Sequence, residues 1–382
     1  MPLNIAFAIP TFNRVGSLKN TIESIAQQNC DVDIKMSVLI SNKSSNDETH
    51  EFLSNLHFLY PKLDFKIQST SPEQAKFCCA EDNFASLGAM ISDDLDWVWW
   101  LGDDDYLFSK NSLCAVMDII KKSTADNLKL IHACQARRSR KTGEVLTSSF
   151  LDLSNHIGLH EIAGWMSSLV MDSELAKNIL IDYSPDLLNS AMNSKGQKSA
   201  FAHATNILKY IHNEKIAFID LPLVEPQHEK QTPESLMRWQ VENVGERYLL
   251  IPRDLELLRN QIDLGKFSRQ FFRYIGYSLW DRYISFIIHH LVDENMDKAT
   301  KSDPDSKIFK EIIDGYWDSL AIIPLMLNDI HDQKSLAVLI DSIRLISDRH
   351  IDRKFEDMQT ANKLKTWALT LNRQNYGFKT LL

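Results

Sequence analysis

Apolar runs separated by polar turns divide the first hundred residues into alternating strands and helices. Residues 3–9, 35–40 and 65–68 are short apolar runs that predict strands. Apolar side chains at helical spacing predict a helix over 18–28. Residues 97–101 are apolar on both faces, which is typical of a central strand covered on each side. The alternation predicts an α/β domain with a mostly parallel sheet.

The middle of the chain continues with mixed strands and helices. Residues 137–143 form a basic connection, and 189–199 are polar and contain glycine, so both stretches predict loops. A helix is also expected over 75–92, before the strand at 97–101. The remaining predicted elements are helices over 113–121, 175–181 and 202–212 and strands over 129–136, 165–171 and 216–224.

Strand patterns nearly disappear after about residue 232. Helical periodicity recurs over 255–261, 267–292, 308–328 and 334–346. We therefore predict two domains, an α/β domain over residues 1–232 and an α-helical region over 233–382.

Composition limits the classes of protein that this chain can represent. The 382 residues are 44% hydrophobic and 24% charged, which argues against a disordered chain. The net charge of -9 argues against a general nucleic-acid binder. The apolar run at 320–327 is far shorter than the about 20 residues of a membrane-spanning helix. Without a signal-like start, and with five cysteines in no paired pattern, the chain is expected in the cytoplasm with reduced thiols.

Three polar segments follow the predicted strands, at residues 11–14, 41–47 and 102–105. In parallel α/β sheets, ligands bind beyond the carboxyl ends of the strands. The three segments are therefore expected to meet at one edge of the sheet and to form a binding site.

The sequence Trp-Leu-Gly-Asp-Asp-Asp at 100–105 carries the strongest chemical signal. Adjacent carboxylates repel one another, and a bound cation relieves that cost. Carboxylate oxygens suit Mg²⁺ or Mn²⁺, whereas an acidic turn that caps the next helix is the alternative. The position after a buried strand favours the metal. The segments at 10–14 and 41–49, taken alone, are typical of ordinary helix caps.

Taken together, these segments resemble the family 2 glycosyltransferases of GT-A fold. Residues 9–14 resemble the opening strand and loop of that family, 41–49 its second loop, and 100–105 its Asp-x-Asp metal motif. The Trp-Leu-Gly-Asp-Asp-Asp form is similar to a bacterial subgroup that includes abequosyltransferase-like enzymes of O-antigen synthesis. Asn83 resembles an Asn often found before the fourth strand. The resemblance covers about residues 3–230 and does not extend to the helical region.

The resemblance implies a nucleotide-sugar donor, an inverting transfer and a Mn²⁺ or Mg²⁺ cofactor. It implies that Asp104 and Asp105 hold the metal and that Asp103 faces the ribose or supports the water shell of the metal. His228 follows the last predicted strand, where some relatives complete the metal site with a His; a surface His is the alternative. The implied nucleotide-binding residues, besides Asp103, are Pro10, Thr11, Asn13, Arg14, Asn42 and Asn83.

Asn42 departs from the family pattern, which has an Asp that accepts from a base imide N–H. An Asn side chain can also donate, which suits N3 of cytosine and so a CDP- or CMP-linked donor. Alternatively, its carbonyl oxygen accepts from uracil or thymine.

The general base that an inverting transfer needs has three candidates. Asp186 precedes the polar loop, His203 lies in the following predicted helix, and Asp172 precedes the helix at 175–181. A buried structural role is the alternative for His203, and a helix cap is the alternative for Asp172.

Two basic clusters have more than one explanation. The first cluster, around residues 137–141, would bind phosphates or an anionic lipid-linked acceptor, or else is a solvated loop. The second cluster lies among aromatic residues in the helical region, and packing on the catalytic domain or on a second subunit explains it better than a peripheral membrane contact. Its residues are Arg269, Arg273, Trp280 and Arg282.

The sequence thus predicts a metal-dependent glycosyltransferase of bacterial surface polysaccharide synthesis, such as O-antigen or capsule, with a glycan or lipid-linked acceptor. One alternative is the transfer of another nucleotide-activated group, such as a polyol phosphate. The other is a non-catalytic nucleotide-binding or scaffold protein that keeps the GT-A fold.

Overall fold

The computed structural model describes two compact units, and each is considered by itself. Met1–Ser154, Ile162–Asn189 and His203–Thr232 belong to the first unit, and Asn155–Glu161, Ser190–Ala202 and Pro233–Leu382 belong to the second. The described residues are 2–30, 33–44, 47–75, 80–123, 127–183, 199, 201–227, 244–262, 265–274, 277–278 and 307–351.

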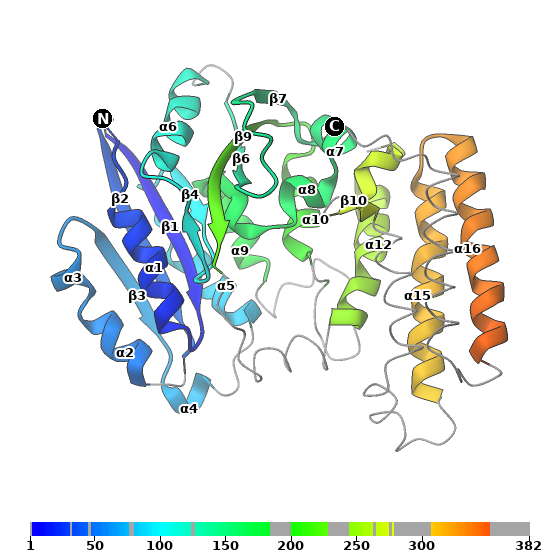
Figure 1. Ribbon diagram of the computed structural model, residues 1–382, viewed down its shortest axis with the longest axis horizontal. Helices are drawn as coiled ribbons and strands as arrows, with labels where there is room; N and C mark the ends of the chain where they lie inside the picture. The colour runs from blue at the N-terminus through cyan, green and yellow to red at the C-terminus, as the bar shows by residue number, and fades with distance from the viewer. Residues whose placement is uncertain are drawn as a thin grey trace. The chain divides into compact units, whose positions relative to one another are not determined.

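A mixed sheet of nine strands forms the centre of the first unit, within the described residues (Figure 1). Its order is β3-β2-β1-β4-β8-β6-β9-β5, and β7 also pairs with β9. Strands β3, β2, β1 and β4 run parallel, whereas β8 is antiparallel to both β4 and β6. The α/β prediction is confirmed. The strands are β1 (Leu3–Thr11), β2 (Ile34–Asn42), β3 (Asp64–Ser69), β4 (Trp97–Trp100), β5 (Asp105–Leu107), β6 (Leu130–Gln135), β7 (Val145–Ser149), β8 (Leu169–Asp172) and β9 (Lys215–Pro226).

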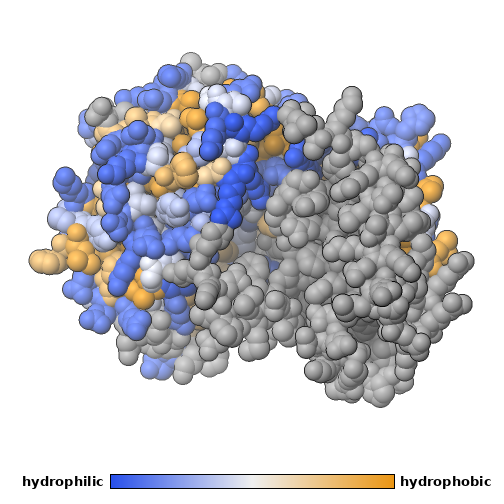
Figure 2. Space-filling view, in the orientation of Figure 1, coloured by the Kyte–Doolittle hydropathy of each residue, from blue (hydrophilic) through white to orange (hydrophobic). Residues whose placement is uncertain are grey.

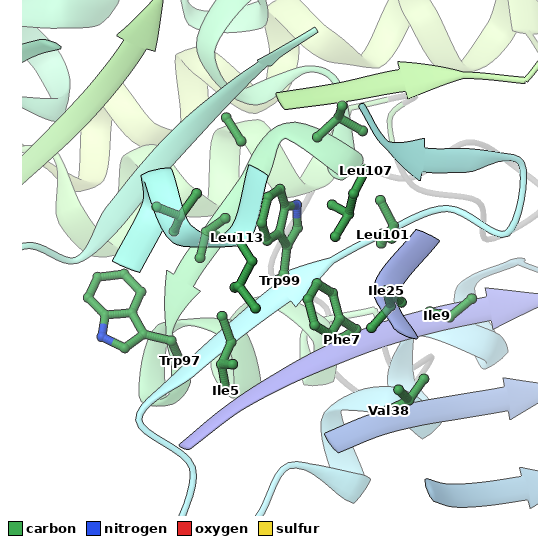
Figure 3. Close-up of a cluster of buried hydrophobic side chains, with 14 of the residues drawn as sticks. Ile5, Phe7, Ile9, Ile25, Val38, Trp97, Trp99, Leu101, Leu107 and Leu113 are labelled. Carbon is green, nitrogen blue, oxygen red and sulfur yellow. The ribbon is translucent and has the colours of Figure 1, made fainter. Parts of the chain in front are cut away.

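Alternate residues of the central strands point to opposite faces of the sheet, as the period of two requires. On one face, Phe7 of β1 stacks against Trp99 of β4 with ring centroids 5.7 Å apart. Apolar residues of three helices complete this core, and Figure 3 shows part of it, with Ile25 and Leu113 beside the strands. They are α1 (Val15–Ala26), α2 (Asp47–Ser54) and α6 (Ser112–Lys122), and the short helix α3 (Leu56–Leu59) adds Leu56.

The other face of the sheet carries α5 (Ala80–Met90) and α9 (Ser173–Ile181). These helices approach closely at Gly88, where an added Cβ would lie 2.9 Å from the backbone nitrogen of Ile181. On the same side, α10 (Ala202–Ile211) brings His203 to the ring of Trp100, with centroids 5.4 Å apart. Trp100, the last residue of β4 before the acidic segment, is therefore held in a closely packed layer.

The second unit is mainly helical in its described part. Its long helices are α12 (Val244–Gln261), α15 (Lys307–Met326) and α16 (Ile330–Ile351). The prediction of a helix from residue 267 is wrong for the described residues of that range. Phe267 forms an isolated bridge with Leu327, and the chain continues as a 3₁₀ turn η2 (Arg269–Phe272) and a hairpin of β10 (Arg273–Tyr274) and β11 (Tyr277–Ser278). The aromatic side chains form a stack instead, since Phe267 lies on Phe271 with centroids 4.0 Å apart.

Several other boundaries differ from the sequence prediction. The helix expected over 75–92 is described as α4 (Pro72–Ala75) and α5, and residues 76–79 between them are outside the described residues. The strand expected over 165–171 begins as a 3₁₀ turn, η1 (Met166–Ser168), before β8. The sequence analysis did not predict β7, α7 (Phe150–Ile157) or α8 (Leu159–Ala163).

The described surface of the first unit is largely hydrophilic on the face shown in Figure 2. An apolar spot at its left edge lies where Figure 1 places α3, which carries the exposed residues Phe58 and Leu59. Two such residues make a smaller patch than those that mark interfaces. Among the described helices, none has the length and apolar character needed to cross a bilayer.

We predict that Gly88→Ala destabilises the first unit. Alanine normally favours a helix over glycine by about 1 kcal/mol, so an ordinary helical position would gain stability. Here the new Cβ meets backbone 2.9 Å away, and we expect a loss of about 1–3 kcal/mol in the free energy of unfolding. Denaturant unfolding would measure it, and a variant more stable than the wild type would contradict the close helix contact.

Candidate functional site

The carboxyl ends of β2, β1 and β4 bring the three polar segments to one edge of the sheet. Thr11 pairs with Asn42 in the β1–β2 register, and the N–H of Lys43 donates to the carbonyl of Thr11 at 3.1 Å. On the other side of β1, the N–H of Leu101 donates to the carbonyl of Ala8 at 3.0 Å. The expected convergence of these segments is present in the structure.

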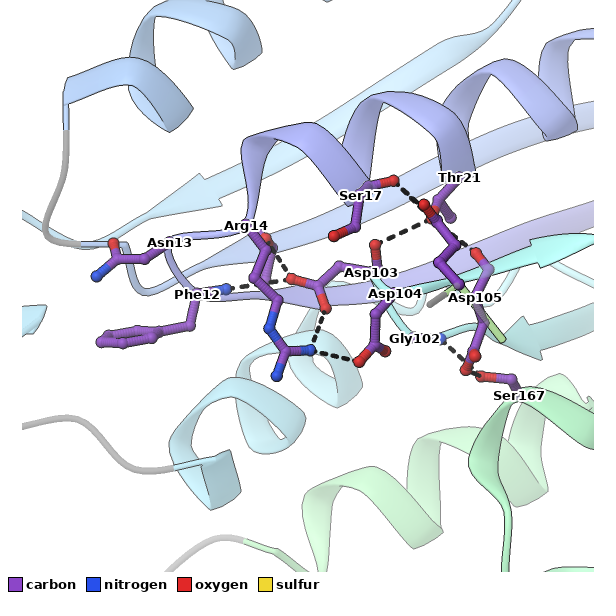
Figure 4. A network of polar contacts seen from close by, with 12 residues as sticks. Phe12, Asn13, Arg14, Ser17, Thr21, Gly102, Asp103, Asp104, Asp105 and Ser167 are labelled. Carbon is purple, nitrogen blue, oxygen red and sulfur yellow. Dashed lines mark hydrogen bonds and ion pairs between the residues drawn. The ribbon is translucent and has the colours of Figure 1, made fainter. Parts of the chain in front are cut away.

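Asp103 is a buried carboxylate of this edge, with 5% of the residue exposed, and Figure 4 shows its contacts. Its Oδ2 accepts from the hydroxyl of Thr11 at 2.7 Å and from the N–H of Phe12 at 3.4 Å. Its Oδ1 accepts from Nη1 of Arg14 at 3.2 Å. Burial raises the pKa of Asp103 to about 7, against the opposing charge of Arg14.

Asp104 is more open, with 47% of its side chain exposed. Its Oδ2 accepts from the same Nη1 of Arg14 at 2.6 Å, so one nitrogen bridges two carboxylates. Burial alone would lower the pKa of Arg14, but Asp103 and Asp104 raise it above its ordinary value. The guanidinium is therefore a charged partner of both residues.

The side chain of Asp105 contacts Ser167 instead of Arg14. Its Oδ2 accepts from the hydroxyl of Ser167, which in turn accepts from the N–H of Gly102 at 2.9 Å. Burial, joined by repulsion from Asp104, raises the pKa of Asp105 to about 8. A Cβ on Gly102 would lie 2.9 Å from Oδ2 of Asp105 and 3.0 Å from Oδ1 of Asp104, so a larger residue there would displace these carboxylates.

Helix α1 and the residue after β9 form hydrogen bonds with the backbone of this acidic turn. The hydroxyl of Thr21 lies within hydrogen-bond distance of the carbonyls of Asp103, at 3.0 Å, and Asp105, at 2.6 Å. The N–H of Gln227 donates to the carbonyl of Asp104 at 2.8 Å, and its side-chain amide donates to the carbonyl of Ser17 at 3.0 Å. The backbone of all three aspartates is thus tied to neighbouring elements.

The loop after β2 is organised by Asn42. The side-chain oxygen of Asn42 accepts from the N–H of Ser44 at 2.9 Å, and its amide nitrogen lies 3.4 Å from Nδ1 of His50 and 3.3 Å from Oγ of Ser69. Nε2 of His50 lies 3.0 Å from the carbonyl of Ser44. If Nε2 carries the proton, both contacts of the ring are satisfied, with Nδ1 accepting from Asn42.

The remaining predicted nucleotide residues lie next to this loop. Asn13 has a positive φ of 56° and its N–H donates to Oγ of Ser44 at 2.8 Å. Asn83 is buried on α5, and its amide donates to the carbonyl of Thr11 at 3.1 Å. Pro10 pairs with Ser41 in the sheet. The structure therefore brings together Pro10, Thr11, Asn13, Arg14, Asn42, Asn83 and Asp103.

Asp103 and Asp104 converge on one nitrogen of Arg14, while Oδ1 of Asp104 and Oδ2 of Asp105 lie 3.0 and 2.9 Å from the point that a Cβ on Gly102 would occupy. The implied metal pair of Asp104 and Asp105 stays a prediction. Oδ1 of Asp103 and Oδ2 of Asp104 both contact one nitrogen of Arg14, and a Mg²⁺ or Mn²⁺ ion near that point would find two oxygen ligands. The donor set fits a hard cation that keeps several waters. No group of three potential His, Cys, Asp or Glu ligands occurs among the described residues. His228 lies outside them.

The candidate base Asp172 is not part of this site. It pairs with Trp97 at the start of β4, whereas the acidic turn follows the other end of that strand. Its Oδ1 accepts from the N–H groups of Glu174 and Leu175 at 3.2 and 3.3 Å. Asp172 is therefore the N-cap of α9, the alternative that the sequence offered for this residue.

His203 lies in the packed layer behind β4. Its Nδ1 is 2.9 Å from the hydroxyl of Tyr183, and the backbone N–H of His203 donates to the same hydroxyl at 3.1 Å. The residue is 4% exposed, so its surroundings match a structural role. Asp186 lies outside the described residues.

The basic turn at 137–143 is organised by a carboxylate on β9. Asp220 accepts from Oγ of Ser139, the N–H of Arg140 and Oγ1 of Thr142 at 3.0, 2.7 and 2.8 Å. Burial opposes ionisation, but these hydrogen bonds lower the pKa of Asp220 below its ordinary value. Arg137 pairs with Glu225 at 3.1 Å. The basic residues around 137–141 therefore belong to a surface turn that these contacts hold in place.

Ser167, Thr21 and Gln227 are site residues that the sequence analysis did not identify. They belong to η1, to α1 and to the residue after β9, and they act through hydrogen bonds to the acidic turn. No spacing pattern links them to residues 102–105, because Ser167 is 62 positions from Asp105.

The comparisons with known proteins concern the fold. No protein-family model matches the chain, and no curated protein sequence matches it either. Staphylococcus aureus TarS 1–349 in complex with UDP-GlcNAc is similar with a TM-score of 0.51 and 12% identity over 93% of each chain. The same TarS segment in complex with UDP gives a TM-score of 0.50 at 11% identity, again over 93% of each chain. These likenesses confirm the GT-A fold of the prediction.

We predict that Asp105 makes stability pH-dependent in protein freed of divalent cations with a chelator. The folded pKa is about 8 and the ordinary value is 3.8, so between them the folded state keeps a proton that the unfolded chain has released. The free energy of unfolding should therefore fall as pH rises from about 4 to about 8.

Asp105→Asn removes this titration, so its stability should fall less steeply with pH than that of the wild type. Denaturant unfolding at several pH values measures both slopes. Asp118→Asn, which changes an exposed carboxylate on α6, serves as the control substitution. Equal slopes for Asp105→Asn and the wild type would contradict the assignment.

Proposed function

We propose that the protein is a metal-dependent, inverting glycosyltransferase that uses a nucleotide-sugar donor. The observation that carries the proposal is the convergence of Asp103 and Asp104 at the end of β4, beside the loops after β1 and β2. Ligands bind at this edge of α/β sheets. TarS, with the same fold, has been solved with UDP-GlcNAc bound, which supports the choice of ligand class.

Each residue of the site has a stated part in this proposal. A divalent cation held by Asp103 and Asp104 supplies charge that stabilises a departing nucleoside diphosphate. Thr11 and the N–H of Phe12 orient Asp103 by occupying its second oxygen. The hydroxyl of Ser167 donates to Asp105 and orients it beside Asp104. The loops that carry Asn13 and Asn42 bind the nucleoside and hold the donor for attack by the acceptor hydroxyl.

The donor base that we propose is cytosine, because of the hydrogen bonds of Asn42. Its side-chain oxygen accepts from the N–H of Ser44, so a base that enters this loop would meet the amide N–H₂ in exchange for its 3.4 Å contact with His50 or its 3.3 Å contact with Ser69. A donor there matches N3 or O2 of cytosine and not the imide N–H of uracil. Uracil or thymine binding through a rearranged Asn42 is the alternative.

The wider setting follows from the resemblance of the sequence. We propose that residues 1–232 form the catalytic domain and that 233–382 contact the acceptor, a second subunit or a membrane surface. The acceptor is a glycan or a lipid-linked saccharide of bacterial surface polysaccharide synthesis, modified on the cytoplasmic side. Asp186 and His203 stay the predicted candidates for the general base, and His228 a predicted third metal ligand.

Calorimetric titration of UDP, CDP, GDP and dTDP, each with and without Mn²⁺, tests the proposal. We expect one nucleotide, CDP, to bind only with the metal. Asp104→Asn should weaken this metal-dependent binding by more than ~100-fold, because it removes half of the carboxylate pair. The control Asp118→Asn should bind as the wild type does.

Two other functions give different results in the same experiment and in a turnover assay. A transferase of a polyol phosphate releases a nucleoside monophosphate, whereas a nucleotide-sugar enzyme releases the diphosphate. A scaffold protein binds nucleotide without turnover of any donor and acceptor pair. Binding that is unchanged by Mn²⁺ and by Asp104→Asn would contradict the metal site.

A further inference from the structure

Arg14 occupies the position that a cation shared by Asp103 and Asp104 would take. Its Nη1 contacts both carboxylates, at 3.2 and 2.6 Å, in the arrangement shown in Figure 4. A guanidinium nitrogen and a metal ion cannot both lie between the same two oxygens. Binding of a metal to this pair therefore requires that Arg14 move.

The side chain of Arg14 has room and free donors for such a movement. It is 32% exposed, in contrast to Asp103 at 7%. A guanidinium has five N–H donors, and within the described residues only Nη1 of Arg14 makes a side-chain contact. The backbone stays in place, because the carbonyl of Arg14 accepts from the N–H of Leu18 in the first turn of α1.

The charges indicate where the guanidinium goes. Two carboxylates beside one arginine leave a net negative charge, and a divalent cation between them would balance that charge by itself. Arg14 is then released at the edge of the sheet where the donor phosphates arrive. Its planar fork of donors matches phosphate oxygens in a two-point contact.

We propose that Arg14 is a positioning residue that exchanges partners during donor binding. It pairs with Asp103 and Asp104 before the metal binds, and with the diphosphate of the donor afterwards. This inference rests on the proposed function. Arg14 should therefore weaken the binding of the metal when no nucleotide is present. It should strengthen the binding of the nucleotide when the metal is present.

Arg14→Met tests both sides without relying on activity. In Mn²⁺ titrations without nucleotide, followed by calorimetry or by the electron paramagnetic resonance signal of free Mn²⁺, the variant should bind the metal about tenfold more tightly than the wild type. With Mn²⁺ at saturation, it should bind CDP about tenfold more weakly. The four nucleoside diphosphates are compared, so the result does not depend on the base.

Arg137→Met is the matched control. It also removes an arginine that pairs with a carboxylate, Glu225, but at a surface turn. Both affinities should stay at the wild-type values. Arg14→Lys is the second variant, because an ammonium keeps the charge and loses the two-point fork. It should resemble the wild type in Mn²⁺ affinity and Arg14→Met in nucleotide affinity.

The outcomes separate the inference from the proposed function. If Arg14→Met binds Mn²⁺ no more tightly than the wild type while the wild type binds a nucleotide with Mn²⁺, the exchange is overturned and the proposed function stands. Weaker Mn²⁺ binding by Arg14→Met also overturns it, because Arg14 would then hold the carboxylates in place for the metal. If the wild type binds no nucleotide under any condition, the proposed function fails, and with it the exchange.

Discussion

Burial of Asp103 and Asp105, together with the repulsion among the three consecutive carboxylates, is the constraint on which the edge of the sheet depends. Asp103, Asp104 and Asp105 follow a fully buried strand, so water alone cannot compensate all three. Each has a different solution. Asp103 forms hydrogen bonds with Thr11 and Arg14. Asp104 is exposed to solvent and pairs with Arg14, and Asp105 accepts a hydrogen bond from Ser167. The three residues are chemically identical but are placed in three environments.

The strand order makes these solutions available. Because β1 lies between β2 and β4, the loop after β1 supplies Thr11 and Arg14 to the acidic turn on one side. The antiparallel β8 beside β4 brings Ser167 to the other side. The core of Phe7 and Trp99 fixes the strands that carry both loops. A rigid sheet is needed here, since small movements of buried charges change their interaction strongly.

Local patterns in the sequence predicted the central strands, the three polar segments and the acidic turn, because these depend on periodicity and on the chain direction of parallel strands. They did not predict which partner each carboxylate contacts. That choice depends on Ser167, 62 positions away, and on the guanidinium of Arg14, 90 positions away. The helix expected from residue 267 is wrong for a related reason, since a spacing of four in Phe267 and Phe271 also suits stacked rings in a turn. Contacts distant in sequence act in both cases, since Phe267 also forms a bridge with Leu327.

The two buried aspartates and the open one differ in how firmly their neighbours hold them. Asp103 and Asp105 are held by hydroxyl and N–H donors that also define the turn, so changing either alters the backbone around it. Asp104 makes its one side-chain contact, among the described residues, with Arg14. It can therefore change partners without disturbing the fold. A site that must bind and release a charged ligand needs such a carboxylate, together with an arginine that can leave it.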